Sequence, residues 1–429
     1  MFYQRSEHNV SRSQISENAL KVLYRLKKSG FQAYLVGGCV RDLLLGREPK
    51  DFDVVTDAHP EQIKKVFRNC RLIGRRFRLA HVHFGREIIE VATFRGASDN
   101  KDSDDARAHQ NGRLLRDNVY GTIEEDVWRR DFTVNALYYN IQDFSVVDFV
   151  GGMEDHQQGL LQLIGDSEVR FREDPVRMLR AVRFAVKLGF NLHPDCADAM
   201  TKLAGLLNDI PPARLHDEML KLFLGGYAVQ SFETLRHFNL FAVLFPETEQ
   251  SLASEEQGFP KLFLAKALAN TDFRLAEGKT VTPYFLIAAF LWDPVQTLAH
   301  EKIDQGINEI IAYQEAGNEV ISCQVKCTAF PKRIGLSMRE VWNMQPRFAQ
   351  RKSPRSLRLL EHPRFRAAYD FLLLRAETGG ADPALAQWWT DIQQADANKQ
   401  AKMTSGADKP GQRRKRRRRS SRHSNQPAQ

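Results

Sequence analysis

The sequence has little cysteine and no long uninterrupted apolar stretch. Its five cysteines among 429 residues form no Cys-x-x-Cys pair, which excludes a zinc ribbon or a disulfide framework as the basis of the fold. The N-terminal stretch MFYQRSEHNVSRSQ has no apolar core of the kind that secretory signals contain, and no later segment is long and apolar enough to span a bilayer. We therefore expect a cytoplasmic protein without a membrane span.

Acidic residues are missing from one part of the chain. The 62 basic and 53 acidic residues give a formal charge of +9, but eight of the basic residues lie within RRKRRRRSSR at 413–422. The remainder of the chain is therefore nearly neutral. A segment of this composition cannot bury an apolar core, which predicts a disordered basic tail at 396–429 that binds a polyanion.

Short strand and helix patterns alternate in the first part of the chain. A leucine-rich helix is expected at 16–30, followed by a strand at 32–36, a Gly-Gly turn and a second helix. Residues 51–56 have the pattern of a strand, and residues 79–94 have that of two strands joined by a hairpin loop. The polar, acidic segment 96–111 has no periodicity and is expected to be a loop.

Helical patterns dominate the rest of the chain as far as about residue 391, with no Gly/Ser linker and no internal repeat. The fold class is therefore α+β, with a mixed or antiparallel sheet at the N-terminus and helices after it. We expect four parts: an α/β head at 1–155, a helical neck at 156–230, a helical body at 231–395 and the tail at 396–429.

Asp51 and Asp53 are separated by one residue in the expected strand DFDVVT. Residues i and i+2 of a strand project from the same face, and two carboxylates held there repel unless a cation lies between them. Hard oxygen ligands favour Mg²⁺, with Mn²⁺ as the alternative ion, and substrate phosphates commonly complete the Mg²⁺ shell. The other interpretation is a solvated pair at a strand end, and the motif alone does not decide between them.

Gly37 and Gly38 separate the strand at 32–36 from the helix after it, where bare backbone N–H groups could approach phosphates. Arg41, one turn into that helix, adds a planar set of donors suited to phosphate oxygens. Such glycines also occur where a strand and a helix only need to pack closely. The Gly-Gly pair therefore indicates a phosphate site only in combination with the motifs around it.

A third carboxylate would be needed to hold a second metal ion or to activate a hydroxyl. Asp131 in RRDFTVNAL is the first candidate, because the preceding arginines would keep it ionised. Glu90 is the second, because it shares a strand face with apolar residues. The structural alternatives are a salt-bridged acid for Asp131 and an edge-strand charge for Glu90.

Asp174, Arg177 and Arg180 recur at three-residue spacing in EDPVRMLRAVRF, as residues on one helix face would. A carboxylate beside arginine donors can pair with the Watson–Crick edge of a base. Adenine would donate its exocyclic amine to Asp174 and accept at N1 from Arg177. The alternative interpretation is an ordinary surface ion pair.

Four motifs in this order, LVGGCVRDLLLG, DFDVVT, RRDFTVNALYY and EDPVRMLRAVRFA, resemble the class II nucleotidyltransferase superfamily, which contains tRNA CCA-adding enzymes and bacterial poly(A) polymerases. The resemblance implies a polymerase-β-like catalytic head in which Asp51 and Asp53 bind Mg²⁺ at the α-phosphate of the nucleotide. It also implies roles for the following residues: Gly37, Gly38, Arg41 and Arg130 in nucleotide binding, Asp131 in catalysis, and Asp174, Arg177 and Arg180 in recognition of the base.

The segment RLIGRRFRLAHVHFG resembles the bacterial poly(A) polymerase branch. This branch implies template-independent addition of AMP from ATP to RNA 3′ ends, with release of pyrophosphate, as a step that promotes RNA decay. The expected contacts with RNA phosphates are Arg75, Arg76 and Arg78 together with Arg413, Arg414, Lys415, Arg416 and Arg417 of the tail.

Two rival functions remain open from the sequence. A CCA-adding enzyme would use CTP and stop after three nucleotides, whereas an inactive RNA-binding adaptor would act through its basic tail. The paired aspartates and the arginine clusters speak against the adaptor. Whether RNA chaperones or decay nucleases dock on the helical half is also open.

Overall fold

The computed structural model describes residues 1–74, 78–96, 107–110, 113–117, 119–253, 262–351 and 354–404. The described residues belong to two compact units, one formed by Met1–Leu286 and Val320–Pro331, the other by Ile287–Glu319 and Lys332–Gln429. No helix among these residues has the length and apolar character needed to cross a bilayer. The predicted RNA contacts at 75–76 and 413–417, namely Arg75, Arg76, Arg413, Arg414, Lys415, Arg416 and Arg417, lie outside the described residues.

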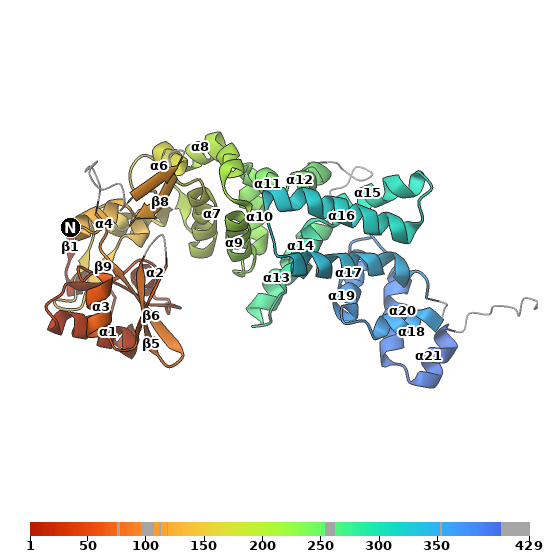
Figure 1. Cartoon of the computed structure of the whole chain (residues 1–429), viewed down its shortest axis with the longest axis horizontal. Coiled ribbons are helices and arrows are strands. Elements are labelled where there is room, and N and C mark those ends of the chain that lie inside the picture. Colours follow the sequence, from red (N-terminus) through yellow and green to blue (C-terminus); the bar gives the residue numbers. More distant parts are fainter. Residues whose placement is uncertain are drawn as a thin grey trace, which may run out of the picture. The chain divides into compact units, whose positions relative to one another are not determined.

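The head contains a mixed sheet with the strand order β1-β10-β9-β2-β3-β6-β5-β4 (Figure 1). Its strands are β1 Phe2–Tyr3, β2 Ala33–Val36, β3 Asp53–Thr56, β4 Cys70–Ile73, β5 Leu79–Phe84, β6 Glu87–Thr93, β9 Tyr138–Asn140 and β10 Val146–Val147. Only β3 and β6 pair in parallel within this sheet, and the other neighbours are antiparallel. The predicted α+β head with a mixed sheet is confirmed.

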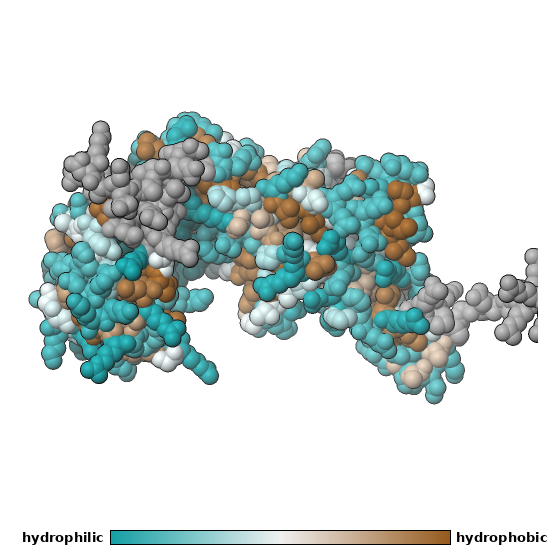
Figure 2. All heavy atoms as spheres, viewed as in Figure 1, coloured by the Kyte–Doolittle hydropathy of each residue, from teal (hydrophilic) through white to brown (hydrophobic). Residues whose placement is uncertain are grey.

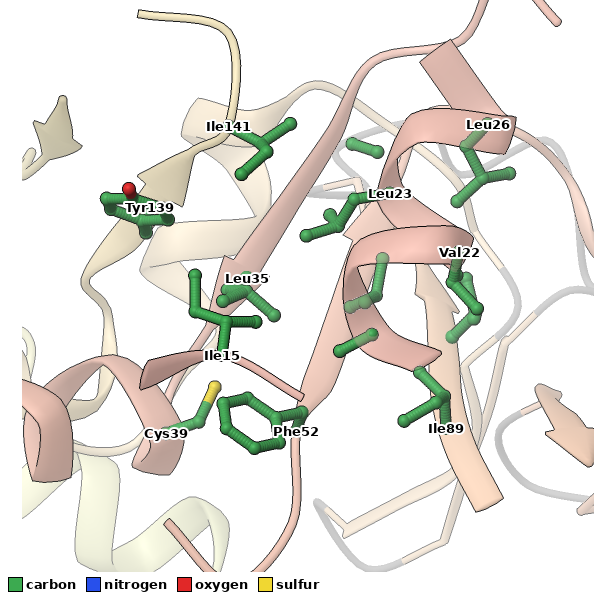
Figure 3. Packing of buried hydrophobic residues seen from close by; sticks show 14 of the residues in the cluster. Ile15, Val22, Leu23, Leu26, Leu35, Cys39, Phe52, Ile89, Tyr139 and Ile141 are labelled. Carbon is green, nitrogen blue, oxygen red and sulfur yellow. The ribbon is translucent and has the colours of Figure 1, made fainter. Parts of the chain in front are cut away.

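Three helices cover one face of this sheet, and each begins where the sequence predicts. In α1 (Glu17–Lys28), Ser16 caps the helix by accepting from the N–H groups of Asn18 and Ala19. Helix α2 (Gly38–Leu44) follows the Gly-Gly turn, and Pro60 occupies the first turn of α3 (Pro60–Val66). Figure 3 shows α1 residues of this core, with strand residues such as Leu35 and Ile89 in the same cluster.

A smaller apolar cluster covers part of the opposite face. It joins Val36, Val55 and Tyr138 of the sheet to Val127 of α4 (Ile123–Trp128) and Ala136 after the 3₁₀ turn Thr133–Asn135. This packing fixes the segment between α4 and β9 against the strands that carry the aspartates.

The polar segment expected to be a loop contains part of a hairpin. Strands β7 (Arg107–Gln110) and β8 (Arg113–Asp117) pair antiparallel in a sheet of their own. The expectation that 96–111 lacks regular structure is therefore wrong for β7, and the rest of the segment, 97–106, lies outside the described residues. The sequence between the two strands is Asn-Gly, which favours tight hairpin turns even where hydrophobic alternation is absent.

The remainder of the first unit is helical, as predicted, apart from two short strands. Its helices are α5 Gly152–Gln158, α6 Ser167–Glu173, α7 Val176–Leu188, α8 Pro194–Leu203, α9 Pro212–Phe223, α10 Ala228–His237, α11 Leu240–Leu244, α12 Pro246–Ala253, α13 Phe263–Ala276 and the first part of α14 Pro283–Phe290. Strands β11 (Leu160–Leu161) and β12 (Asn191–Leu192) pair in parallel and were not predicted.

The segment Val320–Pro331 returns to the first unit at the end of α16 (Glu309–Cys327). The buried Gln324 side chain donates to the carbonyl of Leu244 at 2.7 Å and to Thr328 Oγ1 at 2.8 Å. The N–H of Ala329 donates to the carbonyl of Pro212 at 3.1 Å, at the start of α9. These bonds tie a late part of the sequence to α9 and α11.

The second unit is helical throughout its described part, with a core built around buried tryptophans. It contains α15 Trp292–Asp304, α17 Lys332–Phe348, α18 Pro354–Leu360, α19 Phe365–Glu377, α20 Pro383–Gln394 and α21 Ala397–Thr404. The indole N–H groups of Trp342 and Trp389 donate to the carbonyls of Ala288 and Phe348. Helix α21 lies within 396–429, the segment predicted to be a disordered tail. A helix forms there because its Ala, Lys and Gln residues favour helix and because it packs against α18 and α20.

Candidate active site

Asp53 is the first residue of β3 and lies directly opposite Glu90 in the parallel pairing with β6. Burial raises the pKa of Asp53 to about 6, with further upward contributions from the Glu90 and Asp51 carboxylates and an opposing one from Arg130. Asp51 is exposed in the bend before β3, so the two aspartates do not both belong to the strand as the sequence suggested. The carboxylates of Glu90 and Asp51 nevertheless both lie close enough to Asp53 to act on its pKa.

Asp53 lines two cavities. The larger, of about 540 Å³, also receives six arginine side chains and the Gly-Gly turn. Its lining is Gly37, Gly38, Arg41, Asp53, Arg129, Arg130, Asp131, Asn135, Asp174, Val176, Arg177, Arg180, Phe184, Arg214 and Glu218. The smaller, of about 250 Å³, is lined by Asp53 and Glu90 together with Arg95 and Arg129 among others. The predicted nucleotide-binding residues therefore surround one cavity, and Asp53 belongs to both.

The Gly-Gly turn has the geometry that only glycine adopts easily. Gly37 has φ +79° and ψ −132°, and its N–H donates to the carbonyl of Leu137 at 3.3 Å. A Cβ added at Gly37 would come within 3.8 Å of Arg130 Nη1, and one at Gly38 within 3.5 Å of Arg41 Nη2. The turn thus brings backbone close to two of the predicted phosphate-binding guanidinium groups.

Arg41 is almost fully buried and is already engaged by polar partners. Its Nε and Nη2 donate to Asp42 Oδ1 at 2.9 and 2.7 Å, and its Nη1 donates to Asn135 Oδ1 at 2.5 Å. The guanidinium also lies over the ring of Phe184, 5.3 Å from its centroid. Arg41 is therefore held rigidly at the cavity wall.

Arg130 is held by a carboxylate that the sequence did not single out. Its Nε and Nη2 donate to Asp126 Oδ2 at 3.0 and 2.8 Å, and its Nε also donates to the hydroxyl of Tyr138 at 2.8 Å. Burial lowers the pKa of Arg130, but the charge of Asp126 outweighs this and the net shift is upward. The i, i+4 spacing of Asp126, in α4, and Arg130, just after the end of that helix, was the available signal.

Asp131 is bound by its neighbours rather than directed at Asp53. Arg180 donates to Asp131 Oδ2 through Nε at 2.9 Å and Nη2 at 2.5 Å, while Asn135 and the N–H of Phe132 donate to Oδ1. Burial opposes ionisation, but Arg180 and these donors bring the pKa of Asp131 below its ordinary value. The first-ranked third carboxylate thus has the contacts of a salt-bridged acid, whereas Glu90 is the register partner of Asp53. A catalytic role for Asp131 stays a prediction.

The residues predicted to recognise the base lie around one cavity but not on one helix. Asp174 ends α6 with an extended backbone (φ −149°, ψ 90°), and Arg177 and Arg180 belong to α7. The expectation of a single helix face is wrong because Pro175 disfavours a helical conformation in the residue before it.

All three residues predicted to recognise the base have polar partners in the structure, Arg180 through Asp131 as described above. Asp174 accepts from Arg214 of α9 through Nη1 at 2.9 Å and Nη2 at 2.7 Å. Arg177 donates to the carbonyl of Arg170 at 2.7 Å and to Glu173 at 2.9 Å. No feature of the sequence indicated Arg214, which lies 40 positions after its partner.

Arg78 is the one predicted RNA contact of the β4–β5 connection within the described residues. Its guanidinium pairs with Glu61, and both side chains are about half exposed. It directly precedes Leu79, which lines the smaller cavity.

The mixed sheet, the acidic end of β3 and the arginine-lined cavity define the class of this protein as a nucleotidyltransferase. Family models match three stretches: "Poly A polymerase head domain" at 33–162, "Probable RNA and SrmB- binding site of polymerase A" at 189–252 and "Polymerase A arginine-rich C-terminus" at 305–423. The poly(A) polymerase I of Salmonella typhi is 50% identical over 419 residues, covering 96% of this chain and 90% of that protein. The chain therefore belongs to the poly(A) polymerase I family of the nucleotidyltransferase superfamily.

CCA-adding enzymes are more distant from this chain. The CCA-adding enzyme of Bacillus pumilus is 36% identical over 248 residues, 58% of this chain and 60% of that protein. A solved CCA-adding enzyme in an apo form shares the fold, with a TM-score of 0.62 and 20% identity over 93% of this chain and 89% of the other. The resemblance inferred from the four motifs is confirmed, and the CCA-adding alternative is not favoured. Membership of the family implies a nucleotide substrate and a divalent metal ion.

Proposed function

We propose that this protein is a template-independent polynucleotide adenylyltransferase that transfers AMP from ATP to RNA 3′ ends in the cytoplasm and releases pyrophosphate. The observation that carries the proposal is the position of Asp53, which lines both an arginine-rich cavity and a smaller cavity beside Glu90. A polymerase without a template needs two such adjoining sites, one for the incoming nucleotide and one for the strand that grows.

The larger cavity suits ATP in size and charge. Its volume of about 540 Å³ lies within the range of small-ligand pockets, and arginines offer paired donors to phosphate oxygens. The triphosphate would lie along Gly37, Gly38, Arg41 and Arg130, where bare backbone and fixed guanidinium groups come together. Negative charge that develops during transfer would then meet donors already held in place.

The carboxylates at β3 fit a divalent cation. Burial and two neighbouring acids raise the pKa of Asp53, and a cation would relieve this crowding of negative charge. Within the described residues, no three acidic, histidine or cysteine side chains group closely enough to form a complete metal site. Asp51 and Asp53 would therefore hold Mg²⁺ together with substrate phosphates, and the ion would neutralise charge at the α-phosphate.

The adenine base would be read at the junction of α6 and α7. A carboxylate oxygen of Asp174 keeps acceptor capacity beyond its bonds to Arg214 and can take the exocyclic amine, while Arg177 donates to N1. Cytosine offers the same amine and acceptor pattern through N4 and N3, but its single ring holds that edge closer to the ribose, so selection of ATP over CTP would depend on the distance between these groups and the triphosphate site. Arg180 fixes Asp131 at the back of the cavity.

The 3′ hydroxyl of RNA would enter through the smaller cavity, where Arg95 and Arg129 lie beside Asp53. Its proton would pass to solvent as its oxygen attacks the α-phosphorus; a new P–O bond would form to the RNA, and the bond to pyrophosphate would break. We propose that Arg75, Arg76, Arg78 and the basic residues at 413–417, Lys415 included, hold the strand behind its end through phosphate contacts, so that binding should weaken as salt is added. We also propose that RNA chaperones or decay nucleases dock on the helical half of the chain. The division of the chain into four parts, with boundaries after residues 155, 230 and 395, is a further part of the proposal.

The decisive experiment is extension of a 5′-labelled, unstructured RNA with Mg²⁺ and each of the four nucleoside triphosphates in turn, with a tRNA lacking its 3′ end as the parallel substrate. We expect a long ladder with ATP alone on the plain RNA. Addition confined to the tRNA and dependent on CTP would contradict the proposal, as would no extension of either substrate. Asp53→Asn is the matched control and should give no ladder.

A further inference from the structure

Strands β4, β5 and β6 have one face covered by helices and one face that reaches solvent. Ala80, Val82, Ile89 and Val91 are fully buried in the core beneath α1 and α3. Alternate residues of the same strands point the other way. On this second face the large apolar side chains of Ile73 and Ile88 are 40% and 42% exposed.

The exposed face joins the reaction centre without a break. The strand registers align Asp53 of β3 with Glu90 of β6, Glu90 with His81 of β5, and His81 with Arg71 of β4. His81 Nε2 lies 3.2 Å from Glu90 Oε1, so neighbouring members of this row are in contact. Three strand spacings separate Asp53 from Arg71, a distance of about 14 Å.

A second row runs beside the first. Ile88 of β6 lies opposite His83 of β5, and the rings of His83 and His81 meet edge to face at 6.4 Å between centroids. Arg71, Ile73, His81, His83 and Ile88 together are called the open sheet face. Over the head surface visible in Figure 2, hydrophobic residues form small patches among hydrophilic ones.

We infer that the open sheet face binds the last nucleotides of the RNA strand, an inference that rests on the function proposed above. The 3′ hydroxyl must reach Asp53, and the strand behind it needs a surface that begins there. Imidazole rings and isoleucine side chains offer flat, sequence-tolerant contacts to unstacked bases, and Arg71 at the far edge offers a charge to a phosphate. Continuity with the acidic end of β3 favours RNA over a second copy of the chain.

The test is steady-state adenylation by Ile88→Asp and His83→Asp, which place a negative charge against the strand without touching the ATP cavity. We expect KM for a short oligoadenylate to rise about tenfold and KM for ATP to stay within about twofold of the unchanged protein. Tyr24→Asp is the matched control, because Tyr24 is 43% exposed on α1, which covers the opposite face of the sheet. Thermal unfolding of each variant checks that Ile88, which is exposed, and His83, which is half-buried, are not needed for folding.

Photocrosslinking of an RNA with 4-thiouridine at its last two positions provides the second readout. Crosslinks to 71–73, 79–84 or 87–92 support the inference, and crosslinks confined to other segments overturn it. An unchanged KM for RNA in both variants also overturns it, as does a shift from dimer to monomer in sedimentation, which would assign the face to a second copy. If the unchanged protein does not extend RNA at all, the proposed function fails instead, so the two failures are distinguishable.

Discussion

Both terminal nitrogens of Arg214 bind the carboxylate of Asp174, at 2.9 and 2.7 Å, and so join the start of α9 to the end of α6 at the wall of the larger cavity. The two residues are 40 positions apart in the chain. The pair fixes the plane of the carboxylate that we propose reads the base, because two parallel N–H···O bonds allow little rotation.

Arg214→Ala should therefore weaken base selection more than it weakens catalysis. We expect KM for ATP to rise about tenfold and the preference for ATP over CTP to fall, with kcat changed less. Arg214→Lys should restore only part of the selectivity, since an ammonium group cannot make the paired contact. Competition between ATP and CTP in single-nucleotide addition measures this. Equal loss of kcat with both nucleotides, and no change in preference, would show a structural role alone.

Asp53→Asn should abolish transfer and yet stabilise the fold in metal-free buffer. The folded-state pKa of Asp53, about 6, lies above its ordinary value of 3.8, so between these values the folded chain binds more protons than the unfolded chain. Stability from this group is complete below about pH 4 and is lost as the pH rises through about 6. Replacing the carboxyl by an amide removes that loss and should raise the free energy of unfolding at pH 7 by about 2 kcal/mol.

Urea unfolding at pH 4.5 and pH 7 with a chelator present measures the difference for the variant and the unchanged protein. Asp57→Asn is the control, an exposed acid just after the same strand. Parallel pH dependences for all three proteins would show that Asp53 is not crowded by its neighbours.

Asp131→Asn should destabilise the protein by about 2 kcal/mol, because it leaves the partly exposed guanidinium of Arg180 without its charged hydrogen-bond acceptor. The double variant Asp131→Asn with Arg180→Gln should cost less than the two single costs added together, which a double-mutant cycle measures. Loss of adenylation at unchanged unfolding free energy would instead assign Asp131 a direct role in catalysis.

Gly37→Ala should be more costly than an ordinary glycine replacement. The backbone at Gly37 lies at φ +79° and ψ −132°, a region that side chains avoid, and we expect a loss of about 2 kcal/mol together with a higher KM for ATP. Gly189→Ala is the matched control, since φ +75° and ψ 30° at this helix end cost an alanine about 1 kcal/mol and no atom lies in the way. Equal thermal shifts in the two variants would contradict the expectation.

The sequence was most informative where the structural cause is local. Ser16, Gly37 and Pro60 each mark the start of a helix because capping, positive φ and the missing N–H of proline act within a few residues. The Asn-Gly pair between β7 and β8 is an equally local signal for a hairpin. We nevertheless expected a loop, because the residues around the pair are polar and show no hydrophobic alternation.

Pairings between distant residues could not be obtained in the same way. The position of Glu90 opposite Asp53 depends on the parallel register of β3 and β6, which hydrophobic alternation leaves undetermined. The partners of Asp131 and Asp174 lie 49 and 40 positions away, and any nearby arginine would have satisfied the sequence pattern equally well. The nucleotide-binding candidates, Asp53 and Asp131 therefore line one cavity as expected, whereas Asp51 lies outside its lining and the contacts among these residues could not be predicted.

The return of Val320–Pro331 to the first unit has a consequence for the order in which the chain folds on the ribosome. Leu244 and Pro212 receive hydrogen bonds from Gln324 and Ala329, so α9 and α11 cannot complete their contacts until Gln324, 80 residues after Leu244, and then Ala329 have left the exit tunnel. A nascent chain that stops at Leu286 would lack these two donors and the Phe330 ring that lies beside His216 of α9. Helices α9 and α11 would thus reach their final packing only late in synthesis, long after the strands of the head have been made.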